Sequence, residues 1–196
     1  MPPTRVDGRS LRYRQRRTEL LGELTDYLVE EGLRDFSLRR AAGALGVTHA
    51  SLLRHFGSKD ELVAEVIGTL RANLVARLEA DDEFQAAQST RQLLLSAWRL
   101  LDNPRGRKEF LLLFAAIGEV SPVVPDGFAK AVVQDWLATI EQSLVRDGVP
   151  SGEVPLLATA ALSLIRGLQL DAVAGNDRER SYRAYVLAVD RLFPGA

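Results

Sequence analysis

The side chains in this sequence that are best suited to binding chemistry lie between Ser37 and Phe56, in the segment SLRRAAGALGVTHASLLRHF. The outward positions in its second half are Thr48, His49, Ala50, Ser51, Arg54 and His55. These side chains offer hydrogen-bond donors, hydroxyl groups and a methyl group, and none is acidic. A helix with such a face can enter the major groove of DNA without being repelled by the phosphates. The segment therefore predicts a DNA-contacting surface.

Two short helices joined by a tight turn are needed to present that face. Ser37 is suited to cap the first helix, Gly46 permits the turn, and the second helix runs from Thr48 to about Phe56. The buried stripe of the first helix is expected to be Leu38, Ala41, Ala42 and Leu45. This pattern is typical of a helix-turn-helix.

The flanking segments predict the helices that hold this motif. A first helix is expected to end near Gly32, a C-cap residue. After Gly57, the sequence Ser58-Lys-Asp-Glu61 has the capping-box pattern, in which the Ser58 hydroxyl accepts from the Glu61 amide and the Glu61 carboxylate reaches the Ser58 amide. A long fourth helix is expected to begin there.

The sequence contains no catalytic or metal-binding pattern. Only two histidines are present, both in the helix-turn-helix, and there is no cysteine. No HExxH motif, glycine-rich phosphate loop or nucleophile elbow is found. The pair Asp81-Asp82 is interpreted as a solvated helix end. We expect neither an enzyme nor a protein with a cofactor or a metal.

The charge is distributed unevenly along the chain. The net charge is −1, but residues 1–17 hold six arginines and one aspartate. A basic end on an acidic body is expected when one end meets phosphate, although a solubilising basic tail is the alternative. No signal peptide is found, and no apolar run is judged long enough to cross a membrane. Residence in the cytoplasm is the simplest expectation.

Beyond residue 80 the helical periodicity continues and strand-like alternation is absent. Further helices are expected near residues 88–102, 107–119, 125–147, 153–174 and 178–193. The predicted fold is all-α, with an N-terminal three-helix DNA-binding unit and a C-terminal helical bundle for ligand binding and dimerisation, about nine helices in total. The expected organisation is a basic flexible arm (1–13), a DNA-binding domain (14–58) and a ligand-binding and dimerisation domain (59–196).

Three stretches within residues 14–67 resemble the DNA-binding region of the TetR family of regulators. They are GLRDFSLRRAA from Gly32, LGVT from Leu45 and LLRHFGSKDEL from Leu52. In the rest of the chain the resemblance extends only to length, helix count and the region Gly167-Leu-Gln-Leu. It implies a dimeric transcription factor, usually a repressor, that is released from a palindromic operator by a small-molecule effector.

The resemblance also implies roles for individual positions. Arg39, His49, Ala50 and Arg54 resemble base-contacting positions. Ser37 or Leu38, Ser51, Leu53, His55 and Lys59 resemble positions near the phosphates, whereas Thr48 is expected to act mainly as an N-cap. The family usually has tyrosine where this chain has Leu53, so a phenolic contact to phosphate is missing. The arginine-rich segment Arg5–Arg17 is a hypothetical substitute, along the backbone or in a minor groove.

The two last helices are rich in small and aliphatic residues. Two such helices from each subunit can form a symmetric four-helix interface. The expected interface residues are Ala161, Leu164, Leu168, Tyr185, Val186 and Val189. The alternative is that these stripes pack only within one protomer.

For a ligand, the larger domain offers aromatic and polar side chains among apolar ones. The candidates are Trp98, Phe110, Phe114, Glu119, Trp136 and Gln169. The expected effector is small and largely apolar. The alternatives are that the aromatic residues only form the core, and that the polar ones have partners within the protein. Structural pairing is expected for Arg166 and Asp171. A remaining alternative for the whole chain is a helical scaffold or architectural protein that reads no specific DNA site.

Overall fold

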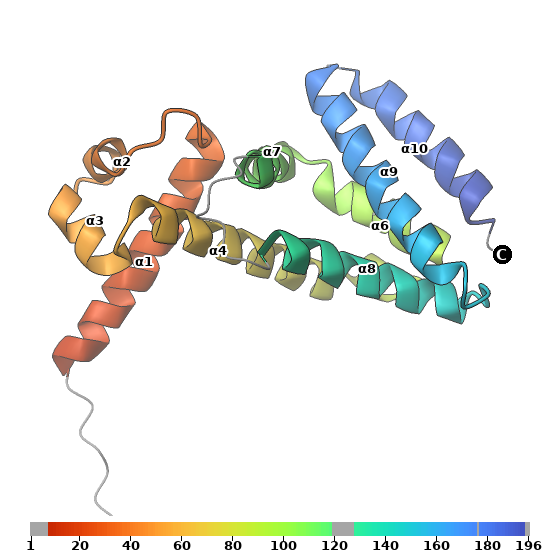
Figure 1. Cartoon of the computed structure of the whole chain (residues 1–196), viewed down its shortest axis with the longest axis horizontal. Coiled ribbons are helices and arrows are strands. Elements are labelled where there is room, and N and C mark those ends of the chain that lie inside the picture. The colour runs from red at the N-terminus through yellow and green to blue at the C-terminus, as the bar shows by residue number, and fades with distance from the viewer. Residues whose placement is uncertain (1–7, 119–127, 176, 195–196) are drawn as a thin grey trace, which may run out of the picture. The chain divides into compact units, whose positions relative to one another are not determined.

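The computed structural model describes residues 8–118, 128–175 and 177–194, and all the regular structure in these ranges is helical (Figure 1). Ten helices are described: α1 (Gly8–Glu31), α2 (Leu38–Ala44), α3 (His49–Phe56), α4 (Lys59–Glu79), α5 (Asp82–Gln85), α6 (Thr90–Leu101), α7 (Pro104–Gly118), α8 (Phe128–Arg146), α9 (Val154–Ala174) and α10 (Arg178–Leu192). The predicted all-α class is confirmed.

The chain divides into two compact units, each with its own core. Unit 1 comprises Met1–Leu70 with Leu112–Pro125, and unit 2 comprises Arg71–Leu111 with Asp126–Ala196. Helix α4 contributes residues to both units. Unit 1 therefore extends beyond the DNA-binding segment that ends at residue 58 in the sequence prediction.

In unit 1, α2 and α3 form the helix-turn-helix where the caps predicted it. The Ser37 hydroxyl accepts a hydrogen bond from the Arg40 amide at 3.3 Å, and the Thr48 hydroxyl accepts one from the Ser51 amide at 3.1 Å. Gly46, in the turn, has a φ of 65°, which a side chain would disfavour. Leu20, Leu24, Leu28, Leu52, Leu62 and Val66 are among the buried residues of this unit.

The first helix is longer at its N-terminus than the sequence predicted. Helix α1 begins at Gly8, so residues 8–13 are helical, although they were expected to belong to a flexible arm. A long-range contact accompanies this extension, because the hydroxyl of Tyr13 donates to the backbone oxygen of Arg54 at 3.1 Å. Nothing in the local sequence indicates that contact.

Helix α4 begins with the predicted serine cap, but its glutamate acts differently. The Ser58 hydroxyl accepts from the Glu61 amide at 3.1 Å and donates to Glu61 Oε2 at 2.8 Å. The carboxylate thus binds the hydroxyl of Ser58 instead of its amide, which donates to the oxygen of Phe56 at 3.0 Å. The start of the helix is as predicted, and the second half of the capping box is not.

Unit 2 has a core between α6, α8, α9 and α10, where α9 and α10 lie side by side (Figure 1). The ring of Trp98 on α6 stacks on that of Tyr185 on α10, with 4.6 Å between the centroids. The buried Tyr185 hydroxyl donates to the Leu94 oxygen at 2.8 Å. Burial of the hydroxyl raises the pKa of Tyr185 well above its usual value, so the phenol stays neutral and remains a donor.

The short helix α5 was not predicted. Asp81 is its N-cap and accepts from the Phe84 amide at 2.8 Å, and Arg99 donates to the same carboxylate at 2.7 and 2.8 Å. The hydrogen bond from Arg99 lowers the pKa of Asp81. The interpretation of Asp81-Asp82 as a solvated helix end is therefore wrong for Asp81, which caps a helix and pairs with an arginine.

Helix α9 corrects the expectation that no apolar stretch is long enough to cross a membrane. It is long and apolar enough to cross a membrane by length and composition, with a mean hydropathy of 1.4 in its most apolar window. Residues Ala158, Ala161, Leu162 and Ile165 lie in the core of unit 2. Core helices of globular proteins pass the same test, so the property is weak support for a membrane span.

Candidate nucleic-acid interface and ligand cavity

The predicted DNA-contacting residues lie at the surface of unit 1, with the exceptions of His55 and of Leu38, the alternative to Ser37, which are both buried. The exposed ones are Arg39, Thr48, Ala50, Leu53, Arg54 and Lys59, and the half-buried ones are Ser37, His49 and Ser51. The opposite side of α3 is buried through Leu52 and Phe56. The helix is thus anchored by its apolar side, and its remaining side is open to a partner.

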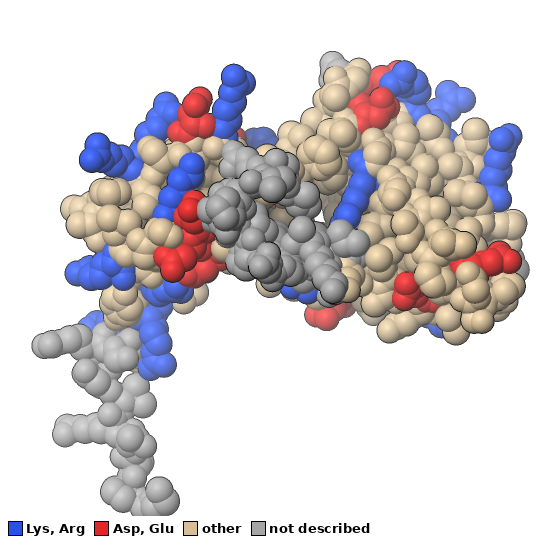
Figure 2. Space-filling view, viewed as in Figure 1, with Lys and Arg blue, Asp and Glu red and all other residues tan. Residues whose placement is uncertain are grey.

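Two arginines at this surface have no ion-pair partner among the described residues. The side chains of Arg39 on α2 and Arg54 on α3 are exposed, and neither takes part in any of the ion pairs. Lys59 lies with its Nζ atom 5.6 Å from the centroid of the Phe36 ring. Arginine and lysine side chains project from unit 1 in Figure 2. Cations left without internal partners are available to phosphates or base edges.

His55 is one of these exceptions, and its prediction needs a correction. It was expected at the surface near phosphates, but only 8% of the residue is exposed. Its ring stacks on that of Tyr13 with 4.6 Å between the centroids. Burial, together with the charges of Arg54, Arg17 and Arg16, lowers the pKa of His55, so the imidazole is neutral near pH 7. The extension of α1 covers this side chain, which the periodicity of α3 did not reveal.

The arginines of α1 whose side chains are described fall into two groups. Arg12 and Arg14 are exposed. Arg16 pairs with Glu19 and Glu23, and Arg17 pairs with Glu65. Part of the basic character seen in the sequence is therefore neutralised within the protein.

Unit 2 contains a cavity of about 830 Å³. Its apolar wall is formed by Leu74, Val75, Leu78, Phe84, Ala87, Leu93, Trp136, Ala138, Val145 and Val154. Its polar wall is formed by Arg71, Glu79, Gln85, Thr139, Glu141, Gln142 and Arg146. The volume and the mixture of apolar and polar side chains are typical of small-molecule sites.

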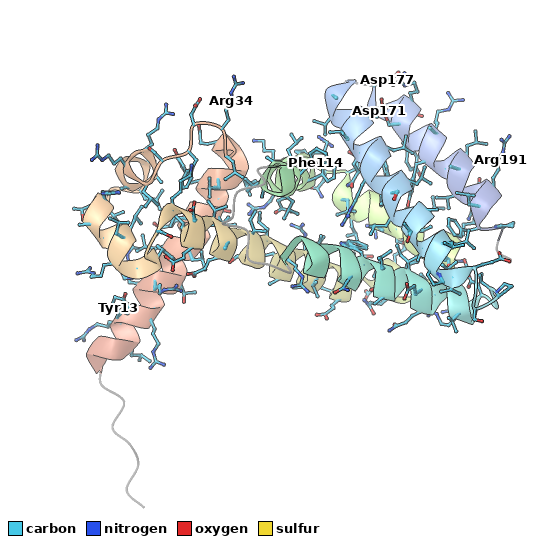
Figure 3. The ribbon with its side chains drawn as sticks, viewed as in Figure 1. Tyr13, Arg34, Phe114, Asp171, Asp177 and Arg191 are labelled. Atoms are coloured by element: carbon cyan, nitrogen blue, oxygen red, sulfur yellow. The ribbon has the colours of Figure 1, made fainter. Side chains whose placement is uncertain are left out.

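Of the predicted ligand-binding residues that the structure describes, Trp136 alone lines this cavity. Trp98 is 3% exposed and belongs to the core, and Gln169 is buried within α9. Phe110 is half-buried on α7, and Phe114 is 48% exposed on the same helix (Figure 3). Glu119 lies outside the described residues. The alternative that aromatic residues form the core is thus what the structure shows for Trp98.

The predicted dimer residues also divide into buried and half-buried ones. Ala161, Tyr185 and Val189 are fully buried within one protomer, whereas Leu164, Leu168 and Val186 are half-buried. Large apolar side chains of α9 and α10 that are exposed include Leu156 at 71%, Leu187 at 54% and Tyr182 at 42%. Asp171 pairs within the protein as expected, with Arg180 and with the Ser181 hydroxyl.

Several residues at these sites were missed from the sequence. In the cavity they include Arg71 and Glu79 on α4 and Glu141 and Arg146 on α8. Arg71, Val75 and Glu79 are spaced by four residues and share one helix face, which was a usable signal. The contacts of Tyr13 and Arg17 with α3 had no signal apart from the density of arginines. A search of the described residues finds no group of histidine, cysteine and carboxylate side chains that could hold a metal ion.

Residues 25–66 match the model of the bacterial regulatory proteins of the tetR family. The chain is also similar to the HTH-type transcriptional repressor KstR2 of Rhodococcus jostii, with 42% identity over 52 residues. That match spans 26% of each protein, so it covers about a quarter of the relative's length.

Similarity of fold extends over nearly the whole chain. A transcriptional regulator from Rhodococcus sp. Rha1 shares 24% identity with a TM-score of 0.74, over 90% of this chain and 95% of that one. A putative transcriptional regulator from Saccharomonospora viridis, solved in complex with choline, shares 19% identity with a TM-score of 0.76, over 92% and 98% of the two chains. These relatives are regulators, not enzymes. Residues 25–66 therefore form a helix-turn-helix region like that of the tetR family of bacterial regulatory proteins, and the whole chain shares the fold of these solved regulators.

Proposed function

We propose that this protein is a transcriptional repressor that reads double-stranded DNA with α3. The open side of α3, which carries the unpaired Arg54, is the observation that carries the proposal. The match of residues 25–66 supports it, as does the similarity of this region to a repressor. Such a role implies residence in the cytoplasm.

The base contacts are assigned to Arg39, His49, Ala50 and Arg54. Arginine can bind guanine in a bidentate manner, and the methyl group of alanine can contact thymine. Ser37, Thr48, Ser51 and Lys59 are assigned to the phosphates, which position the helix without reading sequence. Leu53 offers only apolar contact. His55 is buried and is assigned no direct contact with DNA.

The protein is proposed to act as a homodimer, because two recognition helices about 34 Å apart can read a palindrome. The proposed contact lies on the outward faces of α9 and α10, where Leu156 and Leu187 are exposed. Leu164, Leu168 and Val186 are half-buried in the protomer and can complete it. Ala161, Tyr185 and Val189 support this face from within.

The cavity of unit 2 is proposed to bind a small, largely apolar effector that carries a polar group. Its apolar wall supplies burial area, and its arginines and glutamates can orient the polar group. Residues of α4 line the cavity, and the same helix begins at Lys59 in unit 1. The effector lowers the affinity for the operator only if it binds one arrangement of α4 more tightly than the other. The size of the effect is limited by that difference in affinity.

Selection of duplexes from a random pool by the full-length protein tests the proposal. We expect enrichment of one palindromic sequence with two half-sites. Arg54→Ala should lose affinity for that sequence by roughly five- to 150-fold, equivalent to about 1–3 kcal/mol for one bidentate base contact. Absence of any enriched sequence would instead identify a helical scaffold that reads no specific site.

A further inference from the structure

The C-terminal end of α3 is held in an unusual way for so short a helix. It has eight residues, fewer than a helix needs to be stable alone in water. Its last four carbonyl groups also lack partners within the helix. Two of them are satisfied locally: the oxygen of Leu53 accepts from the Gly57 amide at 2.8 Å, and that of Phe56 accepts from the Ser58 amide at 3.0 Å.

The other two carbonyls are satisfied by α1. The Tyr13 hydroxyl donates to the oxygen of Arg54 at 3.1 Å, and Arg17 Nε donates to the oxygen of His55 at 3.0 Å. Tyr13 and Arg17 are four residues apart, so they share one face of α1. The positive charge of Arg17 also favours its place at the C-terminal end of a helix.

The same two side chains make further contacts. The Tyr13 ring stacks on the ring of His55, near the C-terminal end of α3. The guanidinium carbon of Arg17 lies 5.0 Å from the centroid of the Phe56 ring. Arg17 Nη2 also donates to both carboxylate oxygens of Glu65 on α4, at 2.6 and 2.8 Å. Arg17 therefore joins α1, α3 and α4.

We propose that Tyr13 and Arg17 are positioning residues for DNA recognition, and that they form a brace that fixes the orientation of α3. This inference rests on the proposed reading of DNA by α3. A recognition helix discriminates between sequences only if its side chains meet the base edges in one geometry, whereas contact with phosphates tolerates small movements. Loosening of the brace should therefore lower discrimination more than it lowers general affinity for DNA.

Binding of full-length variants to two duplexes tests the brace. The duplexes are the sequence enriched by the wild-type protein and a scrambled sequence of the same composition. Tyr13→Phe removes one hydroxyl and no charge. We expect it to lower the ratio of the two affinities roughly three- to tenfold, the change expected for one lost hydrogen bond. The dependence of binding on salt should stay the same.

Arg17→Gln should lower the ratio further, and Arg12→Gln is its matched control. Arg12 is exposed on the same helix, and the described hydrogen bonds and ring contacts between α1 and α3 are made by Tyr13 and Arg17, so the loss of Arg12 should weaken binding to both duplexes alike. An unchanged ratio in Tyr13→Phe, or an equal fall in Arg12→Gln, would overturn the proposal. If Arg17→Gln fails to fold, Tyr13→Phe decides alone.

Amide hydrogen exchange without DNA separates the brace from the operator proposal. In Tyr13→Phe, the amides of residues 52–57 should exchange faster, while those of α9 keep their wild-type rates. Unchanged exchange in α3 would overturn the brace even if an operator exists. A wild-type protein that enriches no duplex would overturn the operator proposal, and with it the recognition role of Tyr13 and Arg17.

Discussion

The rings of Tyr13 and His55 lie 24° from parallel with their centroids 4.6 Å apart, although the two residues are separated by most of the helix-turn-helix unit. The Nδ1 atom of His55 is buried and has no hydrogen-bond partner among the described residues. Burial is the largest cause of the lowered pKa of His55, and the charge of Arg54 is the next. Burial and the positive charges of three arginines thus keep the imidazole neutral near pH 7.

This arrangement predicts a loss of stability in mild acid. The unfolded protein takes up a proton on His55 near pH 6.5, whereas the folded protein does so only at lower pH. The unfolded state therefore binds more protons in that interval, and the free energy of unfolding falls as the pH drops below about 6.5. Urea unfolding at pH 7.5 and pH 5.5 measures the difference.

The variant His55→Gln should show a smaller loss of stability between the two pH values than the wild-type protein. His49→Gln removes the only other histidine from an accessible position, and it should retain the contribution of His55. Equal pH dependence in the wild-type and His55→Gln proteins would contradict the prediction.

Glu109 is expected to be the most sensitive member of an ion pair in unit 2. Its side chain is 6% exposed and binds Arg77 through both oxygens and Arg105 through one. Glu109→Gln would remove the negative charge that both arginines bind, at a cost of about 2 kcal/mol in the free energy of unfolding. The value lies below that for a fully buried pair because a third of Arg77 is exposed.

Asp190→Asn is the matched control for this measurement. Asp190 pairs with Arg91 at 2.7 Å, but both side chains are about 40% exposed. Exposed pairs contribute less than about 1 kcal/mol. Chemical denaturation of both variants should therefore show the larger loss for Glu109→Gln, and a reversed order would refute the assignment.

The N-cap of α4 gives a third prediction. The Ser58 hydroxyl accepts from the Glu61 amide, which has no other partner at the start of the helix. Ser58→Ala should cost about 1 kcal/mol in stability. Ser58→Thr keeps both the acceptor for the Glu61 amide and the donor to the Glu61 carboxylate, and it should restore most of the stability in thermal unfolding. If the two variants melt at the same temperature, the capping contact is not what stabilises this end.

Local patterns predicted the helix-turn-helix well, because its limits depend on neighbouring residues. The caps at Ser37 and Thr48 and the turn at Gly46 are each determined within a few positions. The start of α1 and the burial of His55 depend on a contact across 42 positions, so periodicity could not reveal them. Helix α5 was missed because its N-cap, Asp81, has a charged partner on another helix.

Periodicity also identifies apolar faces without identifying what covers them. The stripes of α9 and α10 were predicted to form a dimer interface, but Tyr185 and Val189 pack inside the protomer. Trp98 was a candidate for the ligand and instead stacks on Tyr185. In the cavity, the sequence pointed to aromatic residues, whereas most of the polar wall comes from charged and amide side chains that resemble ordinary surface residues.

The outward face of α9 and α10 gives the last prediction, which concerns assembly. Leu187 is 54% exposed on α10, and an apolar side chain at the centre of an interface is buried by association. Leu187→Asp should weaken the dimer by about 2 kcal/mol, or roughly thirtyfold in the dissociation constant, because it places a charge without a partner in that contact.

Leu11→Asp is the control, since Leu11 is 56% exposed but lies on α1. Sedimentation equilibrium measures both variants. A wild-type protein that is monomeric at micromolar concentration would reject the dimer, and an equal effect of the two variants would reject this face as its interface.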